Sequence, residues 1–216
     1  MPESGRDTEF LALGEVARAQ LDRTHRAREE GLAACRRTIR ACGRSIRAIH
    51  RLDPDAYAQL VEEARSGLRE AQEALRPHPS VAAAGFLHDA EKEYAEARLT
   101  RALVDGSPLP DAAELATGLA AWLNGLAEAA SELRRHLLDR LRQGELERAE
   151  QLLGAMEDTY DMLVTIDYPD AITGGLRRTV DALRAVLERS RGDVTTATLQ
   201  GWLRDAIEGV TPPGTE

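Results

Sequence analysis

Three acidic side chains are predicted to share one edge of a helix in the middle of the chain. Asp89, Glu93 and Glu96 are spaced by four and three residues, and a helical wheel places them along the border of the apolar stripe between Phe86 and Tyr94. Carboxylates one turn apart repel each other, and a divalent cation relieves that repulsion. An oxygen ligand set favours Mg²⁺ or Mn²⁺, which can activate water at a phosphodiester. Ordinary solvated helix borders carry the same spacing, so that alternative stays open.

A row of arginines is predicted along one face of another helix. No acidic residue interrupts this segment, and the face lies about 140° from the apolar seam around Ile39 and Ile46. Guanidinium groups bind phosphate bidentately, so the row indicates a nucleic-acid backbone as partner, with weak sequence preference because aromatic side chains are scarce. The alternative is a surface face paired to acidic neighbours. The candidate nucleic-acid contacts are Arg36, Arg37, Arg40, Arg44, Arg47 and Arg51.

Other catalytic signatures are missing from the sequence. It has no HExxH, no paired CxxC, no Walker glycine loop and no GxGxxG. No glutamate stands three residues before any of the five histidines, which argues against a ferritin-like di-iron site.

The elements that position these side chains are predicted to be helices nearly throughout. Ala, Leu, Glu and Arg dominate, and apolar residues recur with a 3.6-residue period. Turn sequences separate the periodic segments, and in the first of them Asp53 is the predicted N-cap and Pro54 the first helical residue. The short connections predict an all-α, antiparallel bundle of seven or eight helices in a single domain.

The acidic edge belongs to a helix predicted at about 81–104, and the longest helix is predicted at about 112–142. One helix is expected to stop near Gly192 and to be followed by a short last helix around 199–207. Residues 1–8 and 210–216 are predicted to be disordered, which leaves 9–209 as the bundle.

Composition points to a cytoplasmic protein without a membrane partner. There is no basic leader followed by an apolar run, and no stretch approaches the ~18 apolar residues of a membrane span. Cys35 and Cys42 lie two turns apart on one helix, too far to form a disulfide with each other. The net charge of −9 excludes an overall basic field, so nucleic-acid binding would require the arginines to be gathered on one surface.

Four blocks of the sequence, in order, resemble the translin family. They are CRRTIRACGRSIRAIHR, AGFLHDAEKEYAEARL, ASELRRHLLDRLRQGELERAE and MEDTYDMLVTIDYPDAITGGLRRTVD, and the match covers roughly residues 20–192. The resemblance implies a seven-helix bundle that assembles into closed octamers with nucleic acid inside. Translin itself binds single-stranded RNA and DNA, whereas Trax carries the acidic residues of a metal-dependent endoribonuclease.

The resemblance also implies a set of site residues. Glu93 and Glu96 match the Glu-x-x-Glu pair of the Trax branch, and Asp161 in TYDML matches a later family aspartate. These three residues are the implied ligands of Mg²⁺ or Mn²⁺, and Glu132 of ASEL joins them as a supporting catalytic residue. Ala90 stands where Trax has a further acid. On a helical wheel Asp161 falls nearly opposite the apolar stripe of its own helix, so only the resemblance supplies it.

Two functions follow from these observations. The first is a Trax-like, homo-oligomeric endoribonuclease acting on single-stranded RNA, and the second is a non-catalytic binder of single-stranded RNA or DNA of the translin type. A helical scaffold with protein partners is a third alternative, which a monomeric mass would favour.

Overall fold

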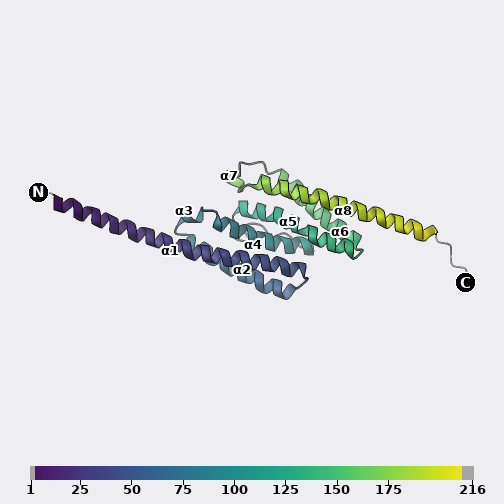
Figure 1. The fold of residues 1–216 in the computed structure, drawn as a ribbon, viewed down its shortest axis with the longest axis horizontal. Helices are drawn as coiled ribbons and strands as arrows, with labels where there is room; N and C mark the ends of the chain where they lie inside the picture. The colour runs from purple at the N-terminus through teal and green to yellow at the C-terminus, as the bar shows by residue number, and fades with distance from the viewer. Residues whose placement is uncertain (1–2, 211–216) are drawn as a thin grey trace.

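The computed structural model describes the backbone of residues 3–210 and the side chains of residues 6–207, and this part of the chain contains helices and no strand (Figure 1). The prediction of an all-α fold is confirmed. The helices are α1 Glu3–His50, α2 Pro54–Leu75, α3 Pro79–Ala82, α4 Phe86–Asp105, α5 Leu119–Arg142, α6 Leu146–Val164, α7 Asp170–Thr173 and α8 Leu176–Val210.

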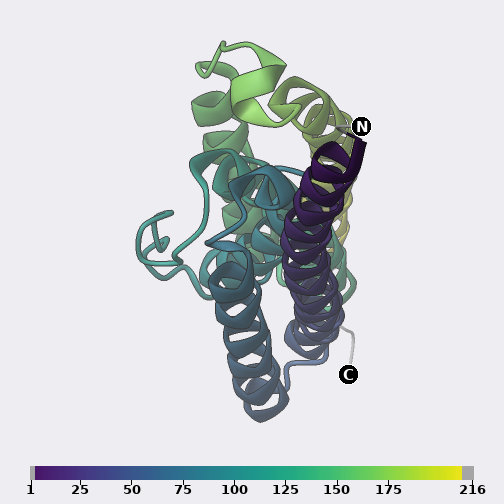
Figure 2. The same cartoon turned by 90° about the vertical axis from the view of Figure 1, so that its left-hand side faces the viewer.

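The middle of the bundle is formed by α4 and α5. Helix α1 packs against α2 on one side and α4 on the other, while α5 packs against α4, α6 and α8. The N-terminal part of α1 and the C-terminal part of α8 project from opposite ends of the bundle (Figure 1). Viewed from the end of the N-terminal arm, α1 and α2 lie side by side (Figure 2).

The turn between α1 and α2 follows its sequence signals. Asp53 caps α2 by accepting a hydrogen bond from the backbone N–H of Ala56 at 3.0 Å, and Pro54 is the first residue of the helix. Leu52 makes the reversal with a φ of 57°. The predicted cap and helix start are therefore confirmed.

Several predicted helix ends differ from the structure. Helix α1 begins at Glu3, inside the segment expected to be disordered, and α8 runs through Gly192 to Val210 as one helix. A glycine inside a helix costs only about 1 kcal/mol, which flanking helix formers offset. Residues 1–2 and 211–216 of the predicted disordered ends lie outside the described residues.

The helices predicted at 81–104 and 112–142 are both shorter in the structure. Gly85, with a φ of 96°, separates α3 from α4. Helix α5 begins only at Leu119, because Asp111 and Glu114 exchange hydrogen bonds of 2.8 and 2.9 Å in a local turn. Leu115 packs into the core from that turn.

The interior is built largely from small side chains. One apolar cluster joins α1, α2, α4 and α5 with the end of α6 and the first half of α8, and a second joins α5, α6 and α8. Cys35 and Cys42 are buried free thiols in the first cluster, as expected from their spacing on one helix. Alanines dominate the contact between α4 and α5, so these two helices approach closely.

No helix within residues 3–210 is long and apolar enough to cross a lipid bilayer.

Candidate metal centre

The predicted acidic edge of α4 faces the interior of the bundle. Ala95 and Ala97 are fully buried on either side of Glu96, and the exposed fraction of Glu96 itself is only 8%. Glu93, one turn earlier, is partly buried. The Glu-x-x-Glu pair therefore does not lie on a solvated helix border, which was the alternative left open by its spacing.

A third carboxylate comes from α5. One ligand oxygen from each of Glu93, Glu96 and Glu128 lies within 4.8 Å of the other two. We call these three residues the acidic centre.

Gly125 allows α5 to approach α4 at this point. A Cβ atom at Gly125 would lie 2.8 Å from the carbonyl oxygen of Lys92 and 2.8 Å from the Cβ of Ala95. Only a residue without a side chain fits that separation. The centre thus depends on a close backbone contact one turn before Glu128.

Lys92 is the positive charge beside the acidic centre. Its ammonium donates a hydrogen bond of 2.8 Å to Glu128 Oε1 and lies 3.6 Å from Glu93 Oε1. Burial opposes the charge on Lys92, but the hydrogen bond and ion pair with Glu128 and the charge of Glu93 outweigh it and raise the pKa of Lys92. The side chain therefore remains an ammonium at neutral pH.

Burial and mutual repulsion alter the protonation of the carboxylates. Burial, together with the charges of Glu93, Glu128 and Glu132, raises the pKa of Glu96 to about 8. Burial also raises the pKa of Glu93. Because a divalent cation removes the repulsion that holds the proton on Glu96, the centre is chemically suited to bind one.

Glu132 lies one turn beyond Glu128 on α5 and is held by a pair of histidines. His50 Nε2, at the end of α1, lies 2.7 Å from Glu132 Oε2, and His50 Nδ1 lies 3.0 Å from His136 Nε2. The hydrogen bond with His50 lowers the pKa of Glu132, while burial and the neighbouring His50 lower the pKa of His136 to about 4. Glu132 is thus an ionised carboxylate next to the acidic centre.

Helix α1 covers the same region. Burial first, and then the charges of Glu93 and Glu96, raise the pKa of the Cys42 thiol. Three helices, α1, α4 and α5, therefore surround the acidic centre. The ligand atoms that converge within the centre are carboxylate oxygens, which suit Mg²⁺ or Mn²⁺ better than a soft metal.

Two of the predicted acids lie away from the centre. Asp161 is exposed on α6, where its charge helps to raise the pKa of Arg191, and Asp89 is exposed in the first turn of α4. The structure brings Glu93 and Glu96 together, places Glu132 near enough for its charge to act on Glu96, and leaves Asp161 apart. Sequence reasoning missed Glu128, although its position four residues before Glu132 on one predicted helix was a usable signal.

The predicted arginine row lies exposed along the second half of α1, and its last member, Arg51, lies in the turn that follows the helix. Two of its members pair with acids of α2, Arg37 with Glu70 at 2.5 Å and Arg44 with Glu63 at 3.6 Å. No other member of the row pairs with an acid in the described part of the chain. These unpaired members are Arg36, Arg40, Arg47 and Arg51.

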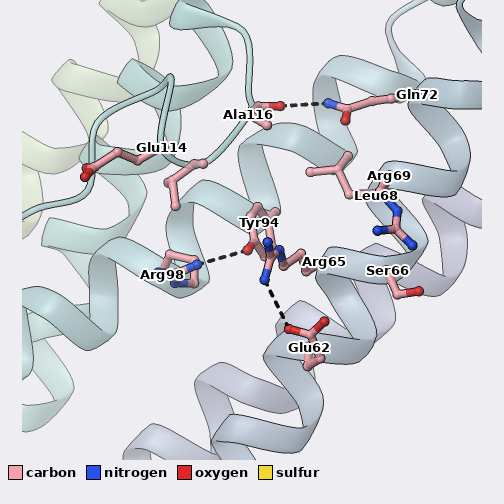
Figure 3. A pocket seen from close by; sticks show the side chains of 11 residues that line it. Glu62, Arg65, Ser66, Leu68, Arg69, Gln72, Tyr94, Arg98, Glu114 and Ala116 are labelled. Carbon is pink, nitrogen blue, oxygen red and sulfur yellow. Dashed lines mark hydrogen bonds and ion pairs between the residues drawn. The ribbon is translucent and has the colours of Figure 1, made fainter.

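A separate hollow of about 510 Å³ lies between α2, α4 and the segment 106–118 (Figure 3). Tyr94 and Arg98 line it from α4, with a hydrogen bond of 3.0 Å from Arg98 to the tyrosine hydroxyl. Gln72 closes one end by donating to the carbonyl of Ala116 at 2.8 Å. The residues that line the hollow include no member of the acidic centre, because Tyr94 projects from α4 at about 100° from Glu93 and about 160° from Glu96.

Fold and centre together define a helical-bundle protein with a carboxylate site between its two middle helices. No known protein-family profile matches the sequence. An uncharacterised protein of Methanocaldococcus jannaschii is 30% identical over 188 residues, which span 85% of this chain and 82% of that protein. The structure of AfC3PO in complex with duplex RNA is similar with a TM-score of 0.78 and 31% identity, over 86% of this chain and 96% of AfC3PO.

The chain therefore belongs to the translin/C3PO family. The structure of apo-NeC3PO has a TM-score of 0.75 over 91% of this chain and 98% of its own, and at 18% identity it supports the fold alone. The predicted family resemblance and the predicted translin-like fold are both confirmed.

Proposed function

We propose that this protein is a divalent-metal-dependent endoribonuclease of the Trax type that acts on single-stranded RNA. The observation that carries the proposal is the convergence of Glu93, Glu96 and Glu128 from two helices. Family membership supports an RNA substrate, since the relative AfC3PO forms a complex with duplex RNA.

The acidic residues have separate roles in this proposal. Glu93, Glu96 and Glu128 would hold Mg²⁺ or Mn²⁺, and Glu96 would release to solvent the proton that it carries near neutral pH. A divalent cation held there would supply Lewis-acid chemistry at a phosphodiester. Glu132, kept ionised by His50, offers a carboxylate that can accept a proton beside the centre.

The exposed side of α1 is the proposed path of the RNA backbone. Arg36, Arg40, Arg47 and Arg51 make no ion pair among the described residues, so their guanidinium groups are available to phosphate. Such contacts are made to the backbone rather than to the bases, and they predict salt-dependent binding with weak sequence preference.

The same arginine row favours a second candidate function, a non-catalytic binder of single-stranded RNA or DNA of the translin type. Binding through α1 does not require the acidic centre. The two candidates differ only in whether RNA is cut, so cleavage decides between them.

Self-association is part of both candidates. The projecting arms of α1 and α8 expose large apolar side chains that nothing in the described chain covers, and such surfaces are typical of protein interfaces. We propose a closed homo-oligomer, an octamer by resemblance to the family. The exposed side chains are Phe10, Leu11, Leu13, Val16, Leu21, Leu199, Trp202 and Leu203.

An RNA cleavage assay tests the proposal. The protein is incubated with a labelled single-stranded RNA in Mg²⁺, in Mn²⁺ and in EDTA, and cleavage is expected only with a metal. The double variant Glu93→Gln and Glu96→Gln should lose cleavage and keep RNA binding, whereas Glu150→Gln, which changes an exposed acid of α6, should retain both. Binding without cleavage in the unmodified protein, with either metal, would leave only the translin-type function.

A further inference from the structure

Lys92 is the only lysine in the sequence, and it stands at the acidic centre. The rest of the 28 lysine and arginine residues are arginines. The side chain of Lys92 leaves α4, reaches α5, and is only 22% exposed. One of its carboxylate partners is on its own helix and the other is on the neighbouring helix.

The chemistry of an ammonium suits this position. It is a compact point charge on a flexible stem, whereas a guanidinium is a broad planar fork. Lys92 neutralises Glu128 and Glu93, while Glu96 makes no ion pair or hydrogen bond within the described chain. The centre is therefore held together without an ion by one tethered positive charge.

The carboxylates that Lys92 contacts are ones that a divalent cation would need. Lys92 Nζ lies 2.8 Å from Glu128 Oε1, and Glu128 is one of the three carboxylates whose oxygens converge within 4.8 Å. An Mg²⁺ ion binds carboxylate oxygen at about 2.1 Å, so an ammonium and a metal on the same carboxylate would repel each other strongly.

We propose that Lys92 is a tethered counter-ion that competes with the divalent cation for Glu93 and Glu128, and so sets the metal affinity of the centre. This inference rests on the proposed function, since it assumes that the acidic centre binds a metal. Lys92 leaves Glu128 when the metal binds, and its flexible stem lets the ammonium turn towards solvent.

Calorimetric titration with MnCl₂ tests the competition without measuring activity. Lys92→Met removes the charge and keeps the apolar stem, and it is expected to bind Mn²⁺ about tenfold or more tightly than the unmodified protein. Lys92→Arg keeps a positive charge and should show no such gain. Arg101→Gln removes one positive charge from a partly exposed ion pair on the same helix. It is the matched control, and its affinity for Mn²⁺ should equal that of the unmodified protein.

The unmodified protein offers an independent test because its side chains include a single primary amine. Acylation by an N-hydroxysuccinimide ester, followed by mass spectrometry of the peptide that contains Lys92, reports the reactivity of this amine. Saturating Mn²⁺ is expected to increase the rate of acylation, since the displaced side chain leaves its carboxylate partners. This measurement also covers the case in which Lys92→Met does not fold.

The results separate the inference from the function on which it rests. If Mn²⁺ binds, and binding is lost in Glu93→Gln/Glu96→Gln, while Lys92→Met binds with unchanged or weaker affinity, Lys92 does not compete and the metal site stands. An acylation rate that does not rise with Mn²⁺ would likewise mean that Lys92 does not compete. If the unmodified protein and Lys92→Met both fail to bind Mn²⁺, the metal centre itself is wrong.

Discussion

Gly125 of α5 lies against the backbone of Lys92 in α4, so closely that a Cβ atom would stand 2.8 Å from the carbonyl oxygen of Lys92. Because the obstacle is backbone, no rotamer change relieves it. The distance between the two helices that supply the acidic centre is therefore set at this contact.

Gly125→Ala is expected to lower the free energy of unfolding by about 1–3 kcal/mol, because the added methyl group must push α4 and α5 apart. Gly154→Ala is the matched control, since a Cβ at Gly154 of α6 meets nothing within 4 Å. The control should be neutral or more stable by up to about 1 kcal/mol. Urea unfolding measures both changes, and equal stabilities for the two variants would contradict the close contact.

Glu96→Gln should remove a pH dependence of stability. The pKa of Glu96 is about 8 in the folded protein, above its ordinary value, so the folded state binds the proton more tightly than the unfolded state does. Its contribution to stability is thus present at low pH and is lost as the pH rises towards 8. In EDTA, the variant should gain stability relative to the unmodified protein between pH 5 and pH 8, by ~1 kcal/mol or more. A constant difference across this range would show that Glu96 ionises freely.

His136→Gln should reduce the loss of folding stability that occurs as the pH falls below neutrality. Burial and His50 lower the pKa of His136 to about 4 in the folded protein, so protons bind more readily to the unfolded state. Stability from this residue is present above its ordinary pKa of ~6.5 and is lost as the pH falls towards 4. Urea midpoints between pH 4.5 and pH 7.5 should fall less steeply in the variant, and an unchanged slope would argue against a buried neutral histidine.

Replacing Arg40 and Arg47 with glutamine should weaken single-stranded RNA binding at every sequence tested. Each lost phosphate contact is expected to reduce the slope of log affinity against log salt by about 1. A control with Arg184→Gln and Arg189→Gln removes two exposed charges from α8 instead. Fluorescence anisotropy at several salt concentrations measures the slopes. If both double variants lose the same amount of RNA affinity, the effect comes from net charge and not from contacts along α1.

Trp202→Glu combined with Leu203→Glu should lower the assembled mass, because two exposed apolar side chains of the α8 arm would no longer pack against another copy. Gln200→Glu introduces charge on the same arm without removing an apolar group, and its mass should not change. Light scattering after size exclusion gives the mass, while circular dichroism verifies the helix content. Retention of the full mass in the double variant would place the interface elsewhere.

Local signals predicted most of the helices but fewer of their ends. The cap at Asp53 and the helix start at Pro54 follow from residue types that favour them wherever they occur. The predicted helix end near Gly192 and the predicted helix start near residue 112 were wrong. Flanking helix formers offset the cost of Gly192, and hydrogen bonds between Asp111 and Glu114 form a local turn where a helix was expected.

The sequence by itself determined the helical class, the facing of Glu93 and Glu96 to one side of their helix, and the exposed arginine row of α1, since periodicity fixes which residues share a face. Only the tertiary structure decided which faces meet. It joined Glu128 to that pair, left Asp161 in solvent, and set Lys92 between two carboxylates. The physical reason is that such relations depend on how helices far apart in the sequence pack. For Glu128 and Lys92 that packing is the approach of α4 and α5, which is limited by the backbone contact at Gly125.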